Sequence, residues 1–411
     1  MSARRGGTAF VLVTVLLDTL GIGLIIPVGP RLVGSFLGDD LGSASRYFGL
    51  LFSLYSLMQF FFAPVLGGLS DRFGRRPVIL MSLLGAAASY LLSGFAPTLG
   101  WLFVGRVIAG ITGASFSAAG AYVADVTPPE KRAQSFGLIG AAFGLGFILG
   151  PALGGALGDV GLRLPYFVAA GLNFVNLLYG TFVLPESLRP ENRRPFTLAR
   201  ANPIGSLRAL GRHPVVLGLT GTMFCAYMAQ MILQSIWALH NQSRFNWTLR
   251  AVGVSLMVVG VTTALVQGVL VRVVTARLGE RRTLLVGLAM GAAGHLLLGL
   301  ADRSWMMYAF LLPLALGGLA GPATQAIITS AVGPSEQGEL QGSLNSLAGM
   351  AAIVGPLVGT SLLARFGPET AQPHVAGAAF FAASAFSVLG LVLALRLFAR
   401  SPAAGVSPSL P

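Results

Sequence analysis

Residues 67–77 read Gly-Gly-Leu-Ser-Asp-Arg-Phe-Gly-Arg-Arg-Pro, a short charged stretch between two long apolar runs. Its centre, Arg-Phe-Gly-Arg-Arg at 72–76, returns 205 residues later as Arg-Leu-Gly-Glu-Arg at 277–281. At the same offset Gly-Pro-Ala-Leu-Gly at 150–154 returns as Gly-Pro-Leu-Val-Gly at 355–359. An offset of half the chain predicts two related halves, as in transporters that place their binding site between the halves.

The composition assigns both halves to the membrane. Of the 411 residues 54% are hydrophobic and only 10% are charged, with a mean hydropathy of +0.77. A soluble domain carries about 25% charged residues, so we expect an all-α integral membrane protein. The single cysteine, Cys225, excludes a disulfide framework and a cysteine-based metal site.

Twelve apolar runs are long enough for a membrane span, which needs roughly 20 residues. The runs are 8–30, 46–67, 77–95, 98–123, 133–157, 164–184, 215–239, 251–273, 282–300, 303–328, 339–363 and 374–398. The first is too long for a cleaved signal peptide and lacks a small-residue cleavage site, so we expect a retained helix. These runs predict two pseudo-symmetric six-helix bundles, residues 1–184 and 215–411, joined by a cytoplasmic linker, 185–214.

The basic residues give an orientation. The net charge of +13 suggests nucleic acid in a soluble protein, but here Lys and Arg lie in short loops, so no nucleic-acid partner is expected. Of the 27 basic residues, 19 fall on the side of the N-terminus, 7 on the other side, and one, Arg106, within a span. The positive-inside rule therefore predicts a multi-pass protein of the inner (plasma) membrane with both termini cytoplasmic.

Two charged residues are expected deep in the membrane. Asp18 lies about 15 Å into the first span, where desolvation favours its protonated form. A carboxyl group that gains and loses a proton at this depth suits a proton-coupled carrier. Arg106, at a comparable depth in the fourth span, stays charged and needs a carboxylate, carbonyl groups or water. His295 is interpreted mainly as a packing residue and secondarily as a titrating or substrate-binding group.

Two glycine-containing stretches suggest movement between states. In the loop, Gly74 permits a tight turn and polar contacts there could hold one carrier state closed. The predicted gating residues are Gly67, Asp71, Arg72, Gly74, Arg75 and Arg76. The fifth span contains Gly146, Gly150 and Gly154 at a spacing of four, which lets another helix approach closely, and Pro151, which kinks it.

Polar side chains within the spans are candidates for contact with a solute. They are Gln59, Asn173, Gln230, Gln234, Thr263, Gln267 and Gln325. A side chain of this kind more often forms a hydrogen bond with a neighbouring helix than with a ligand. No catalytic cluster, phosphate-binding loop or metal site is visible in the spans or loops, so no enzyme activity and no bound cofactor are expected.

The sequence resembles the major facilitator superfamily. Residues 67–77, the run Gly105-Arg106-Val-Ile-Ala-Gly110 and the stretch 146–155 are similar to three of its signature motifs. Within that superfamily, Leu17-Asp18-Thr-Leu-Gly21-Ile-Gly23 and Leu57-Met58-Gln59 resemble the twelve-helix tetracycline/proton antiporters.

The resemblance implies particular roles. It implies proton coupling and cation handling at Asp18, coupling at Arg106, gating at 71–76 and substrate contact near Gln59. It implies that the substrate is a drug chelated to a divalent metal, usually magnesium, which leaves the cell in exchange for a proton.

Three positions depart from the resembled class. Its members carry further acids in the third and ninth spans and in some cases a histidine in the eighth; this chain has Ser89, Gly291 and Thr263 there. These departures leave a less cationic, more lipophilic cargo open. We expect a monomeric proton-coupled antiporter for tetracycline-like or other small amphipathic drugs. The alternatives are a facilitator or proton symporter for another solute, and a non-transporting membrane sensor.

Overall fold

The computed structural model describes residues 2–113, 115–196, 214–332 and 337–400. The described residues form helices and connections, without a strand. The first half contains α1 (Ser2–Ile25), α2 (Gly29–Ser35), α3 (Leu41–Phe73), α4 (Arg75–Phe95), α5 (Leu99–Thr112), α6 (Ser115–Val126), α7 (Arg132–Val160) and α8 (Leu164–Val183). The second contains α10 (Pro214–Phe245), α11 (Leu249–Leu265), α12 (Val271–Leu300), α13 (Ser304–Ala309), α14 (Leu311–Leu316), α15 (Ala320–Ser330), α16 (Gln337–Phe366) and α17 (Ala378–Arg400).

The helices confirm the predicted all-α membrane fold. Ten helical segments among the described residues are long and apolar enough to cross a membrane, and α1 with α2 forms an eleventh that is bent by 43°. One of the ten, Leu249–Leu300, is 52 residues long and contains non-helical backbone at Gly279. Divided at this glycine, it accounts for two of the predicted spans. Most of the predicted linker, 197–213, lies outside the described residues.

Several spans are less regular than their apolar runs predict. Pro27 lies in the break between α1 and α2, and Gly113 follows the end of α5 within the fourth span. The eighth span contains a π-helix at Val266–Leu270, and the tenth contains a 3₁₀ turn at Gly317–Leu319. Hydropathy does not detect these breaks, because the residues around them are apolar or small, apart from Gln267 in the π-helix. Backbone hydrogen bonding changes there, while side-chain polarity does not.

The charged stretch 67–77 is also more helical than expected. α3 extends to Phe73 and α4 begins at Arg75, so the connection is the single residue Gly74. Gly74 has φ 111° and ψ 162°, a backbone conformation that glycine adopts without steric cost. The two helices can therefore be joined without a longer loop.

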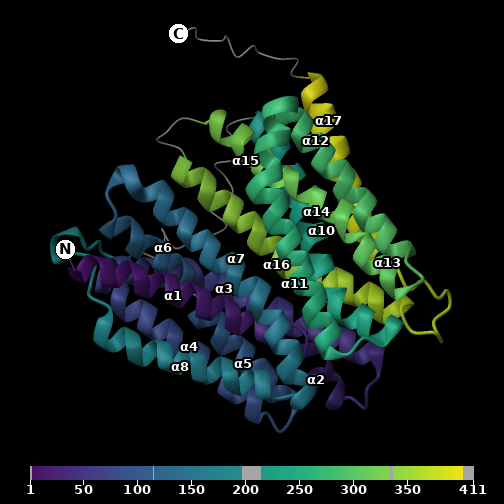
Figure 1. The fold of residues 1–411 in the computed structure, drawn as a ribbon, viewed down its shortest axis with the longest axis horizontal. Coiled ribbons are helices and arrows are strands. Elements are labelled where there is room, and N and C mark those ends of the chain that lie inside the picture. The colour runs from purple at the N-terminus through teal and green to yellow at the C-terminus, as the bar shows by residue number, and fades with distance from the viewer. Residues whose placement is uncertain (1, 114, 197–213, 333–336, 401–411) are drawn as a thin grey trace.

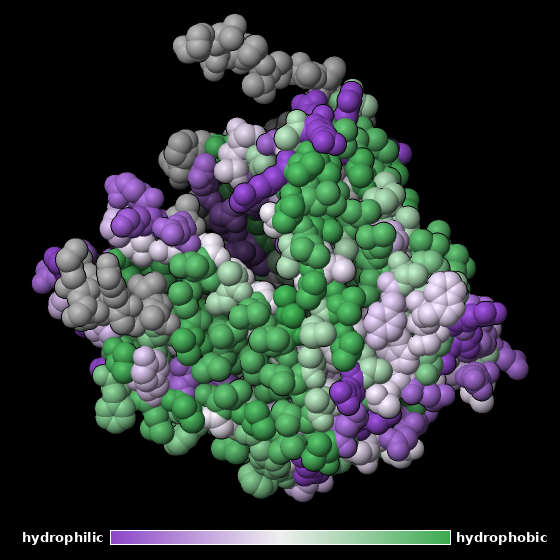
Figure 2. Space-filling view, viewed as in Figure 1, coloured by the Kyte–Doolittle hydropathy of each residue, from purple (hydrophilic) through white to green (hydrophobic). Residues whose placement is uncertain are grey.

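The two halves meet at one end and separate at the other. Figure 1 shows the halves converging near α2 and α11 and diverging toward α6 and α15. At the converging end α7 packs on α11 and α3 packs on α16. Two hydrogen bonds join the halves there: Ser53 Oγ donates to the Ile353 carbonyl at 2.7 Å, and Gln242 Nε2 donates to the Pro27 carbonyl at 2.9 Å. Figure 2 shows a hydrophilic hollow between the separated ends.

Candidate functional site

A cluster of polar side chains lies inside the first half, where five helices bring them together. The charges of Asp18 on α1 and Arg106 on α5 both act on the hydroxyl groups of Tyr55 on α3 and Tyr90 on α4. Arg106 also forms a side-chain hydrogen bond with Tyr166 on α8. The guanidinium group therefore has an acceptor within the membrane. The two charged residues singled out in the sequence belong to one electrostatic environment.

Gln59 connects this cluster to the break in the fourth span. Its side-chain Nε2 donates to the carbonyl oxygen of Gly113 at 3.0 Å and lies 3.3 Å from the hydroxyl of Tyr55. Because α5 ends at Thr112, the Gly113 carbonyl lies at a helix terminus, where backbone oxygens lack intrahelical donors. Gln59 thus stabilises the broken helix, and a substrate contacting its amide would act directly on that break.

Asn173 contributes an acceptor to the same region. Its side chain is fully buried on α8, and Nδ2 donates to the carbonyl of Ala169 at 2.9 Å. Its Oδ1 has no hydrogen-bond partner among the described residues. A Cβ atom added at Gly21, one turn beyond Asp18, would lie 3.3 Å from Nδ2. A buried oxygen without a donor is costly, which makes Asn173 a candidate for bonding to water or to a solute.

A second group of charged residues surrounds the turn at Gly74. Arg75 donates to Asp71 Oδ1 at 2.5 Å and to Asp125 Oδ2, at the end of α6, at 3.2 Å. The Arg75 side chain is only 11% exposed, so both pairs are partly shielded from water. The turn, α3 and α6 are thus held together at the diverging end of the first half.

Glu186 joins the segment after α8 to the same turn. Its carboxylate oxygens accept hydrogen bonds from the backbone N–H groups of Arg75 at 2.8 Å and Arg76 at 3.2 Å. These N–H groups begin α4, where a negative charge is favourable. Any Cβ atom at Gly74 would collide with this carboxylate, which gives the glycine a second role. Arg76 additionally donates to the carbonyl of Thr181 at 2.6 Å.

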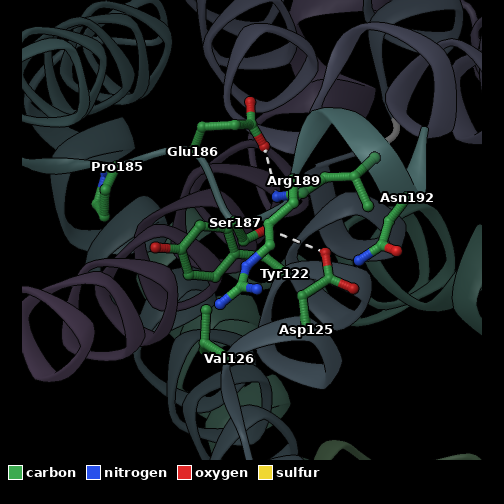
Figure 3. A pocket seen from close by; sticks show the side chains of 9 residues that line it. Tyr122, Asp125, Val126, Pro185, Glu186, Ser187, Arg189 and Asn192 are labelled. Carbon is green, nitrogen blue, oxygen red and sulfur yellow. Dashed lines mark hydrogen bonds between the residues drawn. The ribbon is translucent and has the colours of Figure 1, made fainter.

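A pocket lies beside this network. Figure 3 shows Arg189 extending past Tyr122 toward Val126, while Ser187 Oγ donates to Asp125 Oδ2 at 3.0 Å. The cavity has a volume of about 420 Å³. Its two carboxylates already accept hydrogen bonds from the protein, so the pocket belongs to the charged network.

The sequence interpretation missed Asp125 and Glu186. Both lie just beyond predicted spans and on the same side of the membrane as the arginines of 72–76, a position that could have marked them as partners. Arg72, which the sequence also suggested for gating, is exposed and stacks on Phe73 at 5.1 Å. Gly67 faces open space and makes no close approach.

The glycines of the fifth span pack against the first. A Cβ atom at Gly146 would lie 2.7 Å from the Leu16 carbonyl oxygen, and one at Gly150 would lie 2.8 Å from Gly23 Cα. Gly154 would likewise collide with Leu24. This close approach of backbones is typical of membrane helices with small residues at the interface.

Another surface of α7 contacts the second half. A Cβ atom at Gly253 of α11 would collide with the carbonyl group of Pro151, and one at Gly155 would collide with Leu249. The helix therefore lies between its own half and the opposite one.

The polar candidates of the second half lie on three membrane segments. Gln230 is exposed and Gln234 half-buried on α10, Thr263 is half-buried on α11, and Gln325 is half-buried on α15. Gln267 is exposed within the π-helix, and its Nε2 would lie 3.5 Å from a Cβ atom at Gly318, in the 3₁₀ turn of the tenth span. Two irregular helix segments thus meet at Gln267.

His295 is buried in the second half. Its Nδ1 lies 2.7 Å from the Gly291 carbonyl and 3.4 Å from Ser387 Oγ. These contacts with its own helix and with α17 agree with a packing role. Ser89, at the position of the absent acid of the third span, is buried and donates to the Ala86 carbonyl. Among the described residues no three histidine, cysteine or acidic side chains are grouped as a metal site.

Comparison with known proteins gives consistent matches. The family described as Major Facilitator Superfamily matches residues 11–274 and 219–410. The class C tetracycline resistance protein of Escherichia coli is 43% identical over 86% of this chain and 89% of its own length. The class D protein of Salmonella ordonez is 38% identical over 95% of this chain and 96% of its own.

Solved structures show the same architecture. The human organic anion transporter MFSD10 is 27% identical, with a TM-score of 0.69 over 95% of this chain and 99% of its own. A bacterial homologue of the lysosomal transporter Spinster, in an inward-facing and unoccupied conformation, is 18% identical, with a TM-score of 0.74 over 98% of this chain and 99% of its own.

The chain therefore belongs to the major facilitator superfamily and, within it, to the group that contains the tetracycline resistance proteins. This confirms the family resemblance of the sequence. The protein is a multi-pass membrane protein of a family whose members move small substrates across the membrane with protons.

Proposed function

We propose that this member of the major facilitator superfamily is a drug/proton antiporter that exports tetracycline-like compounds across the inner membrane. The observation that carries the proposal is the similarity to tetracycline resistance proteins along almost the whole chain. The cluster around Asp18 and Arg106 and the hydrophilic hollow between the halves support it. The protein acts as a transporter and not as an enzyme, with the monomer as its functional unit and both termini in the cytoplasm.

Transport proceeds by alternating access, in which residues 1–184 rock against residues 215–398. With cytoplasmic termini, the separated ends of the halves in Figure 1 face the cytoplasm, and this state is ready to load drug from inside. The network of Arg75, Asp71, Asp125 and Glu186 keeps the inner end of the first half rigid while the halves separate. The α7 helix packs against both α1 and α11, and the two halves move relative to each other along this helix.

Asp18 couples the proton to this movement. Entry of a proton from outside neutralises the carboxylate and leaves the positive charge of Arg106 to be balanced by the surrounding hydroxyl groups. The change alters the electrostatic balance among five helices of the first half, so that protonation favours return to the inward-facing state. One proton moving down 100 mV supplies about 2.3 kcal/mol, and each unit of pH gradient adds about 1.4 kcal/mol.

The drug is carried as a magnesium chelate in the tetracycline case, so the metal is cargo. Mg²⁺ prefers oxygen ligands such as carboxylates and usually keeps several waters. Those waters can donate hydrogen bonds to carboxylate and amide oxygens. Asp18, the unpartnered Oδ1 of Asn173 and the amide of Gln59 supply such groups from the first half. From the second half we propose contacts at Gln230, Gln234, Thr263, Gln267 and Gln325. Gln267 is the best candidate for substrate contact among these five residues. It lies where two irregular helix segments meet, and such segments commonly occur at transporter binding sites.

Everted membrane vesicles acidified inside test the proposal. Uptake of tetracycline is measured with and without magnesium, for the wild type, Asp18→Asn and vesicles lacking the protein. We expect uptake that needs the proton gradient and magnesium and falls to the background in Asp18→Asn.

A matched control is Asp302→Asn, which removes a carboxylate from the connection before α13 and should leave uptake unchanged. Uptake by Asp18→Asn at the wild-type rate would contradict the coupling role. If no drug moved protons through the wild type, the facilitator or sensor alternatives would replace the antiporter.

A further inference from the structure

The two halves differ in the acidic residues that surround their duplicated arginine motifs. In the first half Asp71, Asp125 and Glu186 hold the turn and its arginines. At the offset of 205 residues the second half has Ala276, Ser330 and Leu391 in their places. These three acids are lost and Arg75 is replaced by Glu280, whereas Arg277, Arg281 and the positive φ of Gly279, at 74°, are retained.

The second half therefore presents a basic surface, which we call the arginine patch. It consists of Arg272, Arg277, Arg281, Arg282 and Arg396, and all five side chains are exposed. The helix ends are held together because the Arg281 guanidinium lies 5.2 Å from the Phe398 ring centroid, which joins α12 to α17. Figure 2 shows hydrophilic side chains gathered near the end of α17.

Acidic residues are scarce around the patch. The patch contains one acid, the exposed Glu280; the sequence contains no other between Glu191 and Asp302, and α17 contains none. In the described part of the chain no ion pair joins Arg277, Arg282 or Arg396 to an acid, whereas Arg75 of the first half has two. With five arginines and one acid the surface carries a net positive charge, so an external anion would stabilise it.

The residues between the arginines are apolar and exposed. Val273 is 44% exposed, Leu278 40% and Leu395 48%. A surface that alternates guanidinium groups with exposed aliphatic side chains complements a molecule with a phosphate headgroup and hydrocarbon chains. An acidic soluble protein would match the charge but not the apolar part.

We infer that the arginine patch binds anionic phospholipid headgroups of the membrane leaflet in which α12 begins and α17 ends. Arginine forms bidentate hydrogen bonds with phosphate oxygens, and basic residues beside a membrane helix are attracted to anionic lipid. In the first half, carboxylates of the protein balance the charge of the arginine motif. In the second half, the phosphate groups of the lipid balance the charge of the arginine patch. This binding is separate from transport and needs no drug.

Quenching of tryptophan fluorescence by brominated lipids tests the inference. Leu395→Trp places a reporter beside Arg396, and the signal of protein without the reporter is subtracted to remove the four native tryptophans. The full-length protein is reconstituted in phosphatidylcholine with increasing brominated phosphatidylglycerol or brominated phosphatidylcholine. We expect at least a fivefold preference for phosphatidylglycerol, and the preference should shrink as salt is raised.

Two charge-matched variants decide the assignment. Arg277→Gln/Arg282→Gln/Arg396→Gln should bring the preference close to one. Arg250→Gln/Arg303→Gln/Arg365→Gln removes the same charge from the opposite ends of the helices and should leave it unchanged. Equal quenching by the two lipids in the reporter protein, or equal effects of the two triple variants, would overturn the inference. Binding of soluble polyglutamate is measured in parallel. If Arg277→Gln/Arg282→Gln/Arg396→Gln loses this binding but keeps the lipid preference, the patch binds an acidic protein and the inference is wrong.

Discussion

At the scale of single residues, Glu186 illustrates how one carboxylate organises a turn. Its oxygens accept from the backbone N–H groups of Arg75, Arg76 and, at 3.0 Å, Leu188. The first two belong to the beginning of α4, where no intrahelical acceptor is available. The contact therefore acts as a helix cap that is contributed from a distant part of the chain.

We expect Glu186→Gln to destabilise the protein by about 1–2 kcal/mol, since an amide replaces one acceptor oxygen with a donor. Thermal unfolding of the purified protein in detergent measures the effect. Glu191→Gln is the matched control, because Glu191 is exposed in the short turn Pro190–Asn192. Equal melting temperatures for both variants would show that the cap contributes nothing.

The pair of Arg75 and Asp125 supports a second prediction at this scale. Asp125 is 24% exposed, so water screens the pair only in part, and we expect a coupling energy of about 0.5–1 kcal/mol. A double-mutant cycle of Arg75→Ala and Asp125→Ala measures it. In the parallel cycle with Arg72→Ala, which stacks on Phe73 instead, the two effects should add. Additivity in both cycles would argue against the ion pair.

At the scale of elements, α7 is the helix whose glycines carry the packing. Gly154 touches α1 with no room for a side chain, whereas Gly144, on the same helix, faces open space. Gly154→Val should lower stability by about 1–3 kcal/mol or prevent folding, because overpacking forces the helices apart. Gly144→Val makes the same change in helix propensity and should be tolerated.

Expression level and melting temperature of the two valine variants give the comparison. Similar behaviour of both would mean that α7 is free to shift away from α1. Gly154→Ala is a smaller change, but its Cβ atom would still collide with the Leu24 backbone, so its melting temperature should fall between those of the wild type and Gly154→Val.

The spans could be predicted from the sequence, whereas the breaks within them could not. The apolar runs place the spans, because apolar length is a local property of the chain. The break at Gly113 and the π-helix at Val266–Leu270 depend on partners such as Gln59 and Gly318, which lie far away in the sequence. A hydropathy profile contains no information about those partners.

At the scale of the whole molecule, the contact between the halves can be tested by cross-linking. A Cβ atom at Gly260 of α11 would lie 3.5 Å from the Cβ atom of Ile148 on α7, within the range of a disulfide. Ile148→Cys/Gly260→Cys, in a Cys225→Ser background, should form a disulfide under oxidation. Because this contact joins the halves at their converging end, the cross-link should stop transport and a reductant should restore it.

The readouts are the gel mobility of the protein after proteolysis within the linker and drug uptake by vesicles. Each single-cysteine variant serves as a control and should transport equally with and without oxidant. Undiminished uptake by protein that is fully cross-linked would contradict alternating access about this interface.

The membrane class, the repeat of two halves, the position of the spans and the charged residues worth testing could all be predicted from the order of the amino acids. Each of these follows from composition, apolar length or an offset along the chain, and none requires knowledge of distant contacts. The signature motifs carried enough similarity to place the family as well.

The groups that meet in space could be identified only from the folded chain. It placed Asp125 and Glu186 around Arg75, 50 and 111 residues away in the chain, and set Asp18 and Arg106 beside the same tyrosines. It also decided that the halves touch at one end and part at the other. These contacts depend on how whole helices pack and cross, and that geometry is fixed by many small steric fits spread over the chain.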